Sequence, residues 1–388
     1  MDAEQTSVSP TSSPVRRLEP FDKTALVLQG GGALGAYQAG VYEALHEAGI
    51  EPDWVAGVSI GGINSAIIAG NKREHRLERL RDFWETITAR HIWGHTPDGD
   101  APRKARNAWS SHVTMLLGQP GFFKPNMPSP WMSLRGSKTA TSFYDNSPLR
   151  ETLLRLIDFD LLNNGSVRYA AGAVNVQTGN FVYFDSADTD IVPEHIMASG
   201  ALPPALPMVR IGSDYYWDGG LVSNTPLQHM LDNAGSDSLM IFQVDLFSAH
   251  GELPRDMFDV LSRQKDIQYS SRTRMVTDYF RQRIKDQATI RDLLNKLPES
   301  ELNREQLALK KRLSDLPEVN ILHLIYQQMV YEGDAKDYEF SGTSMREHWQ
   351  SGYRDTVRTL QHKQWLASTK KRGGVTVHDV HRADQDDA

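Results

Sequence analysis

Short apolar runs alternate with helix-like patterns in the first seventy residues of the chain. Residues 25–28 and 54–58 are continuous apolar runs of strand length. Apolar residues at helical spacing follow each run, over residues 36–49 and 60–69. A strand–helix–strand–helix order with right-handed crossovers makes the two strands parallel. The pattern therefore predicts an α/β fold with a mostly parallel central sheet.

The middle of the chain continues this pattern with less regular spacing. Helices are predicted over residues 72–90, 149–157 and 194–199, and strands over 169–174, 181–184, 215–218 and 239–247. Between them, residues 91–138 combine tryptophans and phenylalanines with prolines and glycines, and are predicted to be an irregular loop. A loop of this length usually has a function of its own.

The pattern of apolar and charged residues changes after residue 250. Residues 257–294, 301–313 and 343–366 have long, charged helical patterns, and 319–325 forms a short apolar run typical of a strand. The two ends, 1–20 and 371–388, are polar, and we expect both to be disordered tails. The chain is thus divided into an α/β domain over 21–250 and a mainly helical extension over 251–370.

Composition and charge exclude several classes of protein. The 388 residues carry a net charge of −7, which argues against nucleic acid as a partner. They include no cysteine, which rules out disulfides. The longest apolar runs fall short of the roughly 18 residues that span a bilayer. The first twenty residues lack the apolar core of a signal peptide. We expect a cytoplasmic protein.

The loop after the first strand is rich in glycine. It contains Gly30, Gly31, Gly32 and Gly35. Such a loop between a strand and a helix presents backbone N–H groups that can hold negative charge. The same spacing fits a dinucleotide-binding loop, but that function needs an acidic residue at the end of the second strand, and Asp53 precedes that strand.

The turn after the second strand contains a serine between glycines. Gly57, Ser59 and Gly61 form a G-x-S-x-G motif, which places a serine hydroxyl on a sharp strand-to-helix turn as a nucleophile. Next to the glycine loop, this turn predicts an acyl-transfer site with an oxyanion hole. Serine needs a base, and Asp218 at the end of an aromatic strand, followed by Gly219 and Gly220, is a better candidate than any downstream histidine.

From about residue 24 to 249, these three motifs together resemble the patatin-like phospholipase family. The resemblance implies a three-layer α/β/α core, a Ser–Asp dyad of Ser59 and Asp218, and an oxyanion hole made by Gly30, Gly31 and Gly32. It implies no cofactor and no metal. The helical part from Met257 is similar to the C-terminal extension of one bacterial branch of that family.

The resulting hypothesis is a serine hydrolase that cleaves carboxyl esters of lipids. The alternatives are an esterase for smaller soluble esters or hydroxyacid oligomers, and a non-catalytic lipid-binding protein. Residues 72–138 contain about twice as many Lys and Arg as Asp and Glu, together with tryptophan and phenylalanine. This mixture suits a lipid headgroup boundary. We therefore expect residues 91–138 to cap the site and 72–138 to contact the inner membrane surface peripherally. The sequence leaves a homo-oligomer open.

Overall fold

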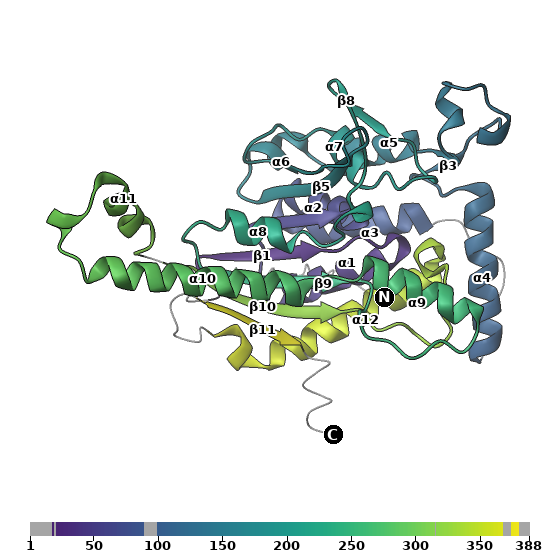
Figure 1. Cartoon of the computed structure of the whole chain (residues 1–388). Helices are drawn as coiled ribbons and strands as arrows, with labels where there is room; N and C mark the ends of the chain where they lie inside the picture. Colours follow the sequence, from purple (N-terminus) through teal and green to yellow (C-terminus); the bar gives the residue numbers. More distant parts are fainter. Residues whose placement is uncertain (1–17, 19–20, 89–98, 315, 368–373, 380–388) are drawn as a thin grey trace, which may run out of the picture.

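A computed structural model describes residues 18, 21–88, 99–314, 316–367 and 374–379. The strands of these residues form one nine-stranded sheet, in the order β11-β10-β9-β1-β2-β5-β8-β7 with β6 paired to β5 (Figure 1). Its strands are β1 (Lys23–Leu28), β2 (Trp54–Val58), β5 (Arg168–Asn175), β6 (Phe181–Asp185), β7 (Val209–Ile211), β8 (Asp214–Asp218), β9 (Leu239–Asp245), β10 (Glu318–Ile325) and β11 (Gly374–Asp379). β3 (Lys124–Pro125) and β4 (Tyr144–Asp145) pair antiparallel in a separate two-stranded sheet.

The sheet is parallel through its centre and antiparallel at one side. Strands β11, β10, β9, β1, β2 and β5 pair in parallel, whereas β6, β7 and β8 pair antiparallel. Successive residues of β1 face opposite sides, so Leu26 and Leu28 enter one apolar cluster and Ala25 and Val27 enter another. Both faces of the sheet are therefore covered, as the predicted α/β/α layering requires.

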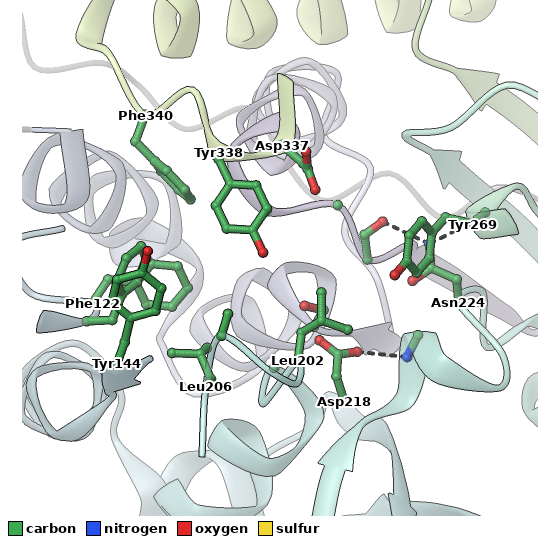
Figure 2. A pocket seen from close by; sticks show the side chains of 18 of the residues that line it. Phe122, Tyr144, Leu202, Leu206, Asp218, Asn224, Tyr269, Asp337, Tyr338 and Phe340 are labelled. Atoms are coloured by element: carbon green, nitrogen blue, oxygen red, sulfur yellow. Dashed lines mark hydrogen bonds between the residues drawn. The ribbon is translucent and has the colours of Figure 1, made fainter. Parts of the chain in front are cut away.

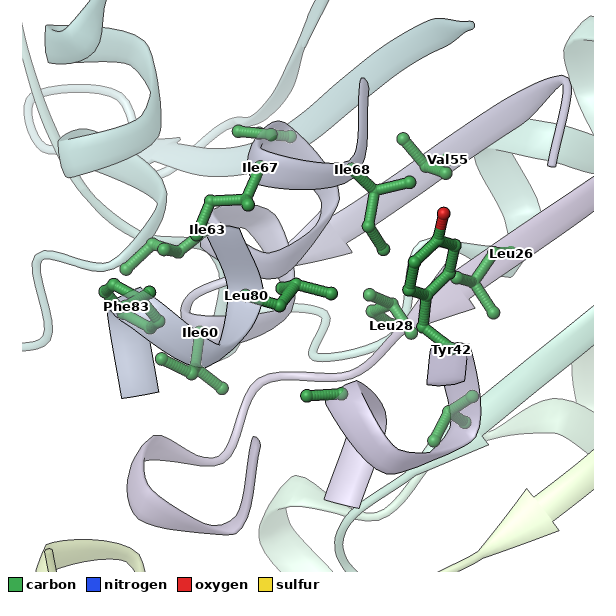
Figure 3. Close-up of a cluster of buried hydrophobic side chains, with 14 of the residues drawn as sticks. Leu26, Leu28, Tyr42, Val55, Ile60, Ile63, Ile67, Ile68, Leu80 and Phe83 are labelled. Carbon is green, nitrogen blue, oxygen red and sulfur yellow. The ribbon is translucent and has the colours of Figure 1, made fainter. Parts of the chain in front are cut away.

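The first face carries the larger core. Helices α1 (Ala36–Glu47), α2 (Ile60–Ala69), α3 (Arg73–Thr88) and α12 (Gly342–Gln361) contribute to it. Figure 3 shows Ile63, Ile67 and Ile68 of α2 packing toward Leu80 and Phe83 of α3 and toward the strands. Because α2 is apolar nearly all round, it is buried along its whole length.

The second face is covered by shorter helices and by part of the C-terminal half. Helix α8 (Leu227–Asn233) and helix α10 (Thr273–Asn295) bury side chains against it, including Phe280 and Ile284. The remaining helices are α4 (Asp100–Leu117), α5 (Ser147–Leu156), α6 (Phe159–Asn164), α7 (Pro193–Ser199), α9 (Met257–Tyr269) and α11 (Arg304–Arg312).

Sequence predictions for three regions are wrong in this structure. Residues 257–294, predicted as one long helical stretch, form two helices, α9 and α10, separated at residues 270–272. Residues 100–117, predicted to lie in an irregular loop, form helix α4. Residues 374–379, predicted to be part of a disordered tail, form β11, which pairs in parallel with β10. Residues 1–17, 89–98 and 380–388 lie outside the described part of the chain, so the disorder predicted for both ends stays a prediction.

Among the described residues, no helix is both long enough and apolar enough to cross a bilayer.

Candidate active site

Ser59 lies on the turn between β2 and α2, as the motif predicts. Its φ of 56° and ψ of −126° make it the one non-glycine residue with positive φ among the described residues. Such a conformation costs about 1–3 kcal/mol and persists only where the surroundings impose it. A Cβ at Gly57 would overlap the backbone of Gly61, and one at Gly61 would overlap the carbonyl of Leu28. The two glycines therefore allow the tight turn that presents the serine.

Asp218 lies at the end of β8. It is close to Ser59 because β5 lies between β2 and β8 and pairs with both. β5 pairs with β2 at Val58 and with β8 at Asp218, and a Cβ at Gly219 would collide with the carbonyl of Gly172 in β5. The Ser59 side chain lies close enough to the Asp218 carboxyl to lower its pKa, and both residues line one cavity. The Gly220 N–H donates a 2.7 Å hydrogen bond to Oδ1 of Asp218. The structure thus brings the two predicted residues together.

The electrostatics of Asp218 are set by burial. Its side chain is 2% exposed. Removal from water raises its pKa from 3.8 to about 7, against the opposing effects of the Gly220 hydrogen bond and of the nearby Ser59 side chain. A carboxyl group with this pKa is able to exchange a proton near neutral pH, which is what a general base requires.

The glycine loop lies beside Ser59, and its close packing explains its composition. A Cβ at Gly30 would collide with Oδ1 of Asn224, and one at Gly32, whose φ is +55°, would collide with the carbonyl of Asp337. The Gly30 N–H donates a 3.2 Å hydrogen bond to the carbonyl of Asn224. This N–H is therefore engaged, contrary to the oxyanion role predicted for Gly30. Within the described residues, the N–H groups of Gly31 and Gly32 have no protein acceptor.

Gly35 has a packing role one turn later. A Cβ there would overlap the side chain of Ile60, next to the serine. Its carbonyl accepts a 3.0 Å hydrogen bond from the buried Asn64 side chain. The fourth glycine therefore allows the loop and α2 to lie in direct contact.

Two amide side chains that the sequence analysis missed hold the loop in place. Asn224 donates through Nδ2 to the carbonyls of Gly30 and Tyr269, both at 3.0 Å. Gln29 accepts from the N–H groups of Leu246 and Phe247 through Oε1. The position of Gln29 directly before the triple glycine is a signal that could have found it, whereas no local pattern singles out Asn224.

A cavity opens above Ser59 and Asp218. Its walls include Phe122 and Phe123, which lie in the segment predicted to cap the site, and Leu202 and Leu206 from the loop before β7 (Figure 2). Trp109 and Trp131 of the same segment are instead 64% and 86% exposed. The lining also contains Tyr269, Asp337, Tyr338 and Phe340 from the C-terminal half, which the sequence did not connect with the site.

The histidines of the described residues lie away from this cavity. His195 accepts a 3.1 Å hydrogen bond from the Val192 N–H, His229 contacts Asp185 at 2.7 Å, and His323 contacts Asp245 at 2.6 Å. Each has a local structural partner. The described residues also contain no cluster of three histidine or acidic side chains able to hold a metal ion.

The fold is a mixed sheet with helices on both faces, and a serine on a strained strand-to-helix turn shares one cavity with a buried aspartate. A family profile described as "Patatin-like phospholipase" matches residues 26–231, more than half of the chain, and one described as "Patatin phospholipase" matches 267–372. The chain belongs to the patatin-like phospholipase family.

Several curated proteins are similar over part of the chain. "Lysophospholipase nte1" of Aspergillus terreus is 25% identical over 238 residues, which is 61% of this chain and 13% of that protein. "Patatin-like phospholipase domain-containing protein 6" of Homo sapiens is 42% identical over 78 residues, 20% of this chain and 6% of that protein. The chain therefore matches only about an eighth or less of the length of these relatives. The solved structure of VipD from Legionella pneumophila aligns with a TM-score of 0.38 and 15% identity, covering 90% of this chain and 67% of VipD.

Proposed function

We propose that this protein hydrolyses carboxyl esters of lipids through a Ser59–Asp218 dyad. The observation that carries the proposal is that Ser59, on a strained turn, shares one cavity with Asp218, a buried carboxyl whose pKa is raised to about 7. Membership of the patatin-like phospholipase family supports lipid esters as the substrate class. The aromatic and aliphatic walls of the cavity suit an acyl chain.

The reaction proceeds in two steps. Asp218 accepts the Ser59 proton while Oγ attacks the ester carbonyl, and Asp218 then gives that proton to the leaving alcohol. The N–H groups of Gly31 and Gly32 bind the oxyanion, and one such donor is typically worth about 3–4 kcal/mol. Asp218 then takes a proton from water as the water attacks the acyl-enzyme, and returns that proton to Ser59 Oγ as the acid leaves.

Labelling with a fluorophosphonate probe tests this assignment. We expect the probe to modify the wild-type protein at one site, identified by mass spectrometry as Ser59, and to leave Ser59→Ala unlabelled. Modification of another serine with Ser59 unmodified would remove Ser59 from the mechanism. Failure of the folded wild type to react would favour the non-catalytic lipid-binding alternative.

We also propose that helix α4 and the loop that follows it contact a lipid surface. Helix α4 buries small polar residues, Asn107, Ser110, Ser111 and Thr114, and leaves Trp109 and Leu116 mostly exposed. A helix that turns its apolar side chains outward needs an apolar partner. Further along, Trp131, Met132 and Leu134 are at least 80% exposed.

The charge of this segment complements an anionic lipid surface. Residues 101–144 contain six Lys and Arg and no Asp or Glu, in a chain whose net charge is −7. Two of the six pair with acidic residues from outside the segment, Arg103 with Glu347 and Lys124 with Asp145. Among the described residues, no acid pairs with Lys104, Arg106, Arg135 or Lys138. Each unpaired cation near an anionic membrane contributes about 1 kcal/mol.

Helix α3, the basic part of the segment predicted to touch the membrane, has a different role. Its Arg76 pairs with Glu51 at 2.7 Å, and Arg81 pairs with Glu43. Leu80, Phe83 and Trp84 are buried in the core. We therefore limit the proposed lipid contact to α4 and the loop over residues 127–138.

A further inference from the structure

The C-terminal half of the chain forms one wall of the cavity above Ser59. Tyr269 ends helix α9, and Asp337 and Tyr338 belong to the short 3-10 helix η6 (Lys336–Tyr338). All lie beyond residue 231, where the first family match ends. Because the C-terminal half supplies part of the cavity wall, its side chains can contact a substrate bound at Ser59.

Two crossed ion pairs fix η6 against α9. Lys265 of α9 contacts Asp337 at 2.7 Å, and the neighbouring Asp266 contacts Lys336, also at 2.7 Å. Lys336 is nearly buried and binds Gln328 as well, at 2.8 Å. The basic and acidic neighbours Lys265 and Asp266 each pair with the oppositely charged member of the neighbours Lys336 and Asp337. A shift of η6 by one residue would bring like charges together, so the two pairs fix both the position and the register of η6.

Further contacts hold η6 beside the glycine loop and α4. The carbonyl of Asp337 lies where a Cβ of Gly32 would be. The Ser111 hydroxyl of α4 donates a 3.2 Å hydrogen bond to the carbonyl of Ala335. Tyr338 is therefore carried by a backbone that is anchored on three sides, next to the proposed oxyanion donors.

The Tyr338 hydroxyl is free to bind a substrate. Figure 2 shows Tyr338 pointing its hydroxyl into the cavity, on the side that faces Leu202 and Asp218. No described residue forms a hydrogen bond with this hydroxyl, whereas the Tyr144 hydroxyl across the cavity donates to the carbonyl of Met115 at 2.6 Å. Burial and the charge of Asp337 raise the Tyr338 pKa, so the group remains a neutral donor at working pH. The half-buried hydroxyl is therefore accessible from the cavity, where a ligand or water can bind it.

The cavity has one apolar side and one polar side. Phe122, Phe340 and Leu206 are grouped toward one end in Figure 2, and Asn224, Tyr269 and Asp337 toward the other. An ester bound at Ser59 extends its acyl and alcohol halves in different directions from the carbonyl. The apolar end suits the acyl chain, which leaves the alcohol half near the polar side chains.

We infer that the Tyr338 hydroxyl binds the alcohol half of the ester, so that the C-terminal half of the chain selects esters of hydroxylated alcohols such as glycerol. This inference rests on the proposed hydrolase function. Hydroxyls of a glycerol-type alcohol both donate and accept hydrogen bonds, as the tyrosine hydroxyl does. An alcohol without such groups gains nothing from Tyr338.

Two substrates with the same acyl chain separate this role from a structural one. Monodecanoylglycerol carries free hydroxyls on its alcohol half, and p-nitrophenyl decanoate carries none. For Tyr338→Phe we expect kcat/KM to fall about five- to tenfold on the glycerol ester, the effect of one neutral hydrogen bond, and less than twofold on the p-nitrophenyl ester. Because both rates come from one preparation, any misfolded fraction cancels from their ratio.

Tyr144→Phe is the matched control, since it removes a cavity hydroxyl that is already engaged with Met115. Its ratio of the two kcat/KM values should equal that of the wild type. An unchanged ratio in Tyr338→Phe, with the wild type active on both esters, would overturn the inference and leave the proposed function intact. A wild type that cleaves neither ester would contradict the proposed function and the inference together.

Discussion

At the scale of single residues, burial sets the pKa of the proposed base, Asp218. Among the described residues, the Gly220 N–H and the nearby Ser59 side chain lower the pKa of Asp218 and no ion pair involves it, so desolvation dominates and the pKa rises to about 7. The sequence predicted both residues, which the structure places at one cavity, because a serine between glycines and an aspartate before two glycines are local patterns. It did not predict the pKa, because burial depends on strands that are distant in sequence.

The pH dependence of hydrolysis follows from this pKa. The dyad needs Asp218 without its proton, so kcat/KM should rise with pH and level off above an apparent pKa near 7. A pH series with p-nitrophenyl decanoate, corrected for background hydrolysis, measures it. A profile that is flat from pH 5 to 8 would show that Asp218 does not titrate in this range.

Asp218→Asn separates catalysis from stability. The folded wild type holds the Asp218 proton up to about pH 7, whereas the unfolded chain loses it near pH 4, so wild-type stability declines between these values by roughly 1.4 kcal/mol per pH unit at most. Asparagine does not titrate. We expect the variant to lose at least about a hundredfold in kcat and yet to unfold at higher urea concentration than the wild type at pH 8.

Urea titrations of both proteins at pH 5 and pH 8 check this expectation. The stability advantage of Asp218→Asn should shrink at pH 5, where the wild-type carboxyl keeps its proton. An Asp218→Asn variant with near wild-type activity would remove the aspartate from the mechanism. A variant less stable at pH 8 than at pH 5, relative to wild type, would contradict the burial argument.

Element by element, hydrophobic spacing predicted most of the fold. Helix α2 occupies residues 60–69 as predicted, because nearly every residue in it is apolar or small. Helix α4 was missed for the opposite reason, since it buries asparagine, serine and threonine and exposes tryptophan and leucine. Spacing rules assume that the apolar side faces the core, and α4 does not obey this assumption.

Vesicle binding tests the proposed role of α4 and its following loop. Replacing the exposed Trp109 and Trp131 by serine should reduce co-sedimentation with anionic vesicles severalfold, because both rings are lost from the proposed contact. Activity on a soluble short-chain ester should change less than twofold.

The matched control is a double substitution at Phe122 and Phe123, which are buried and line the cavity. Replacing both by leucine should alter ester hydrolysis and leave vesicle binding unchanged. Equal vesicle binding by the tryptophan variant and the wild type would mean that α4 and the loop are not a lipid contact.

Across the whole molecule, the two halves of the chain share one sheet and one core. β10 pairs with β9 over seven residues, and α12 packs against α1 so closely that a Cβ at Gly40 would overlap the carbonyl of Trp349. The sequence predicted β10 from its apolar run. It missed β11, whose burial depends on β10 and on α10, where Arg281 donates a 3.0 Å hydrogen bond to the Val375 carbonyl.

Truncation measures what β11 contributes. A chain ending at residue 367 lacks β11, and we expect its free energy of unfolding to be lower by about 2 kcal/mol or more, from lost burial of Val375 and lost strand pairing. A chain ending at residue 379 keeps β11 and is the control. Equal urea midpoints for the two truncated chains would indicate that β11 adds no stability.

The most direct test of the account is the rate of ester hydrolysis by Ser59→Ala. Alanine removes only the hydroxyl, and the glycines that form the turn remain. With wild-type-like thermal unfolding as the criterion of folding, kcat on a lysophospholipid should fall at least about a thousandfold. Activity of the folded variant within tenfold of the wild type would contradict the central claim that Ser59 is the nucleophile.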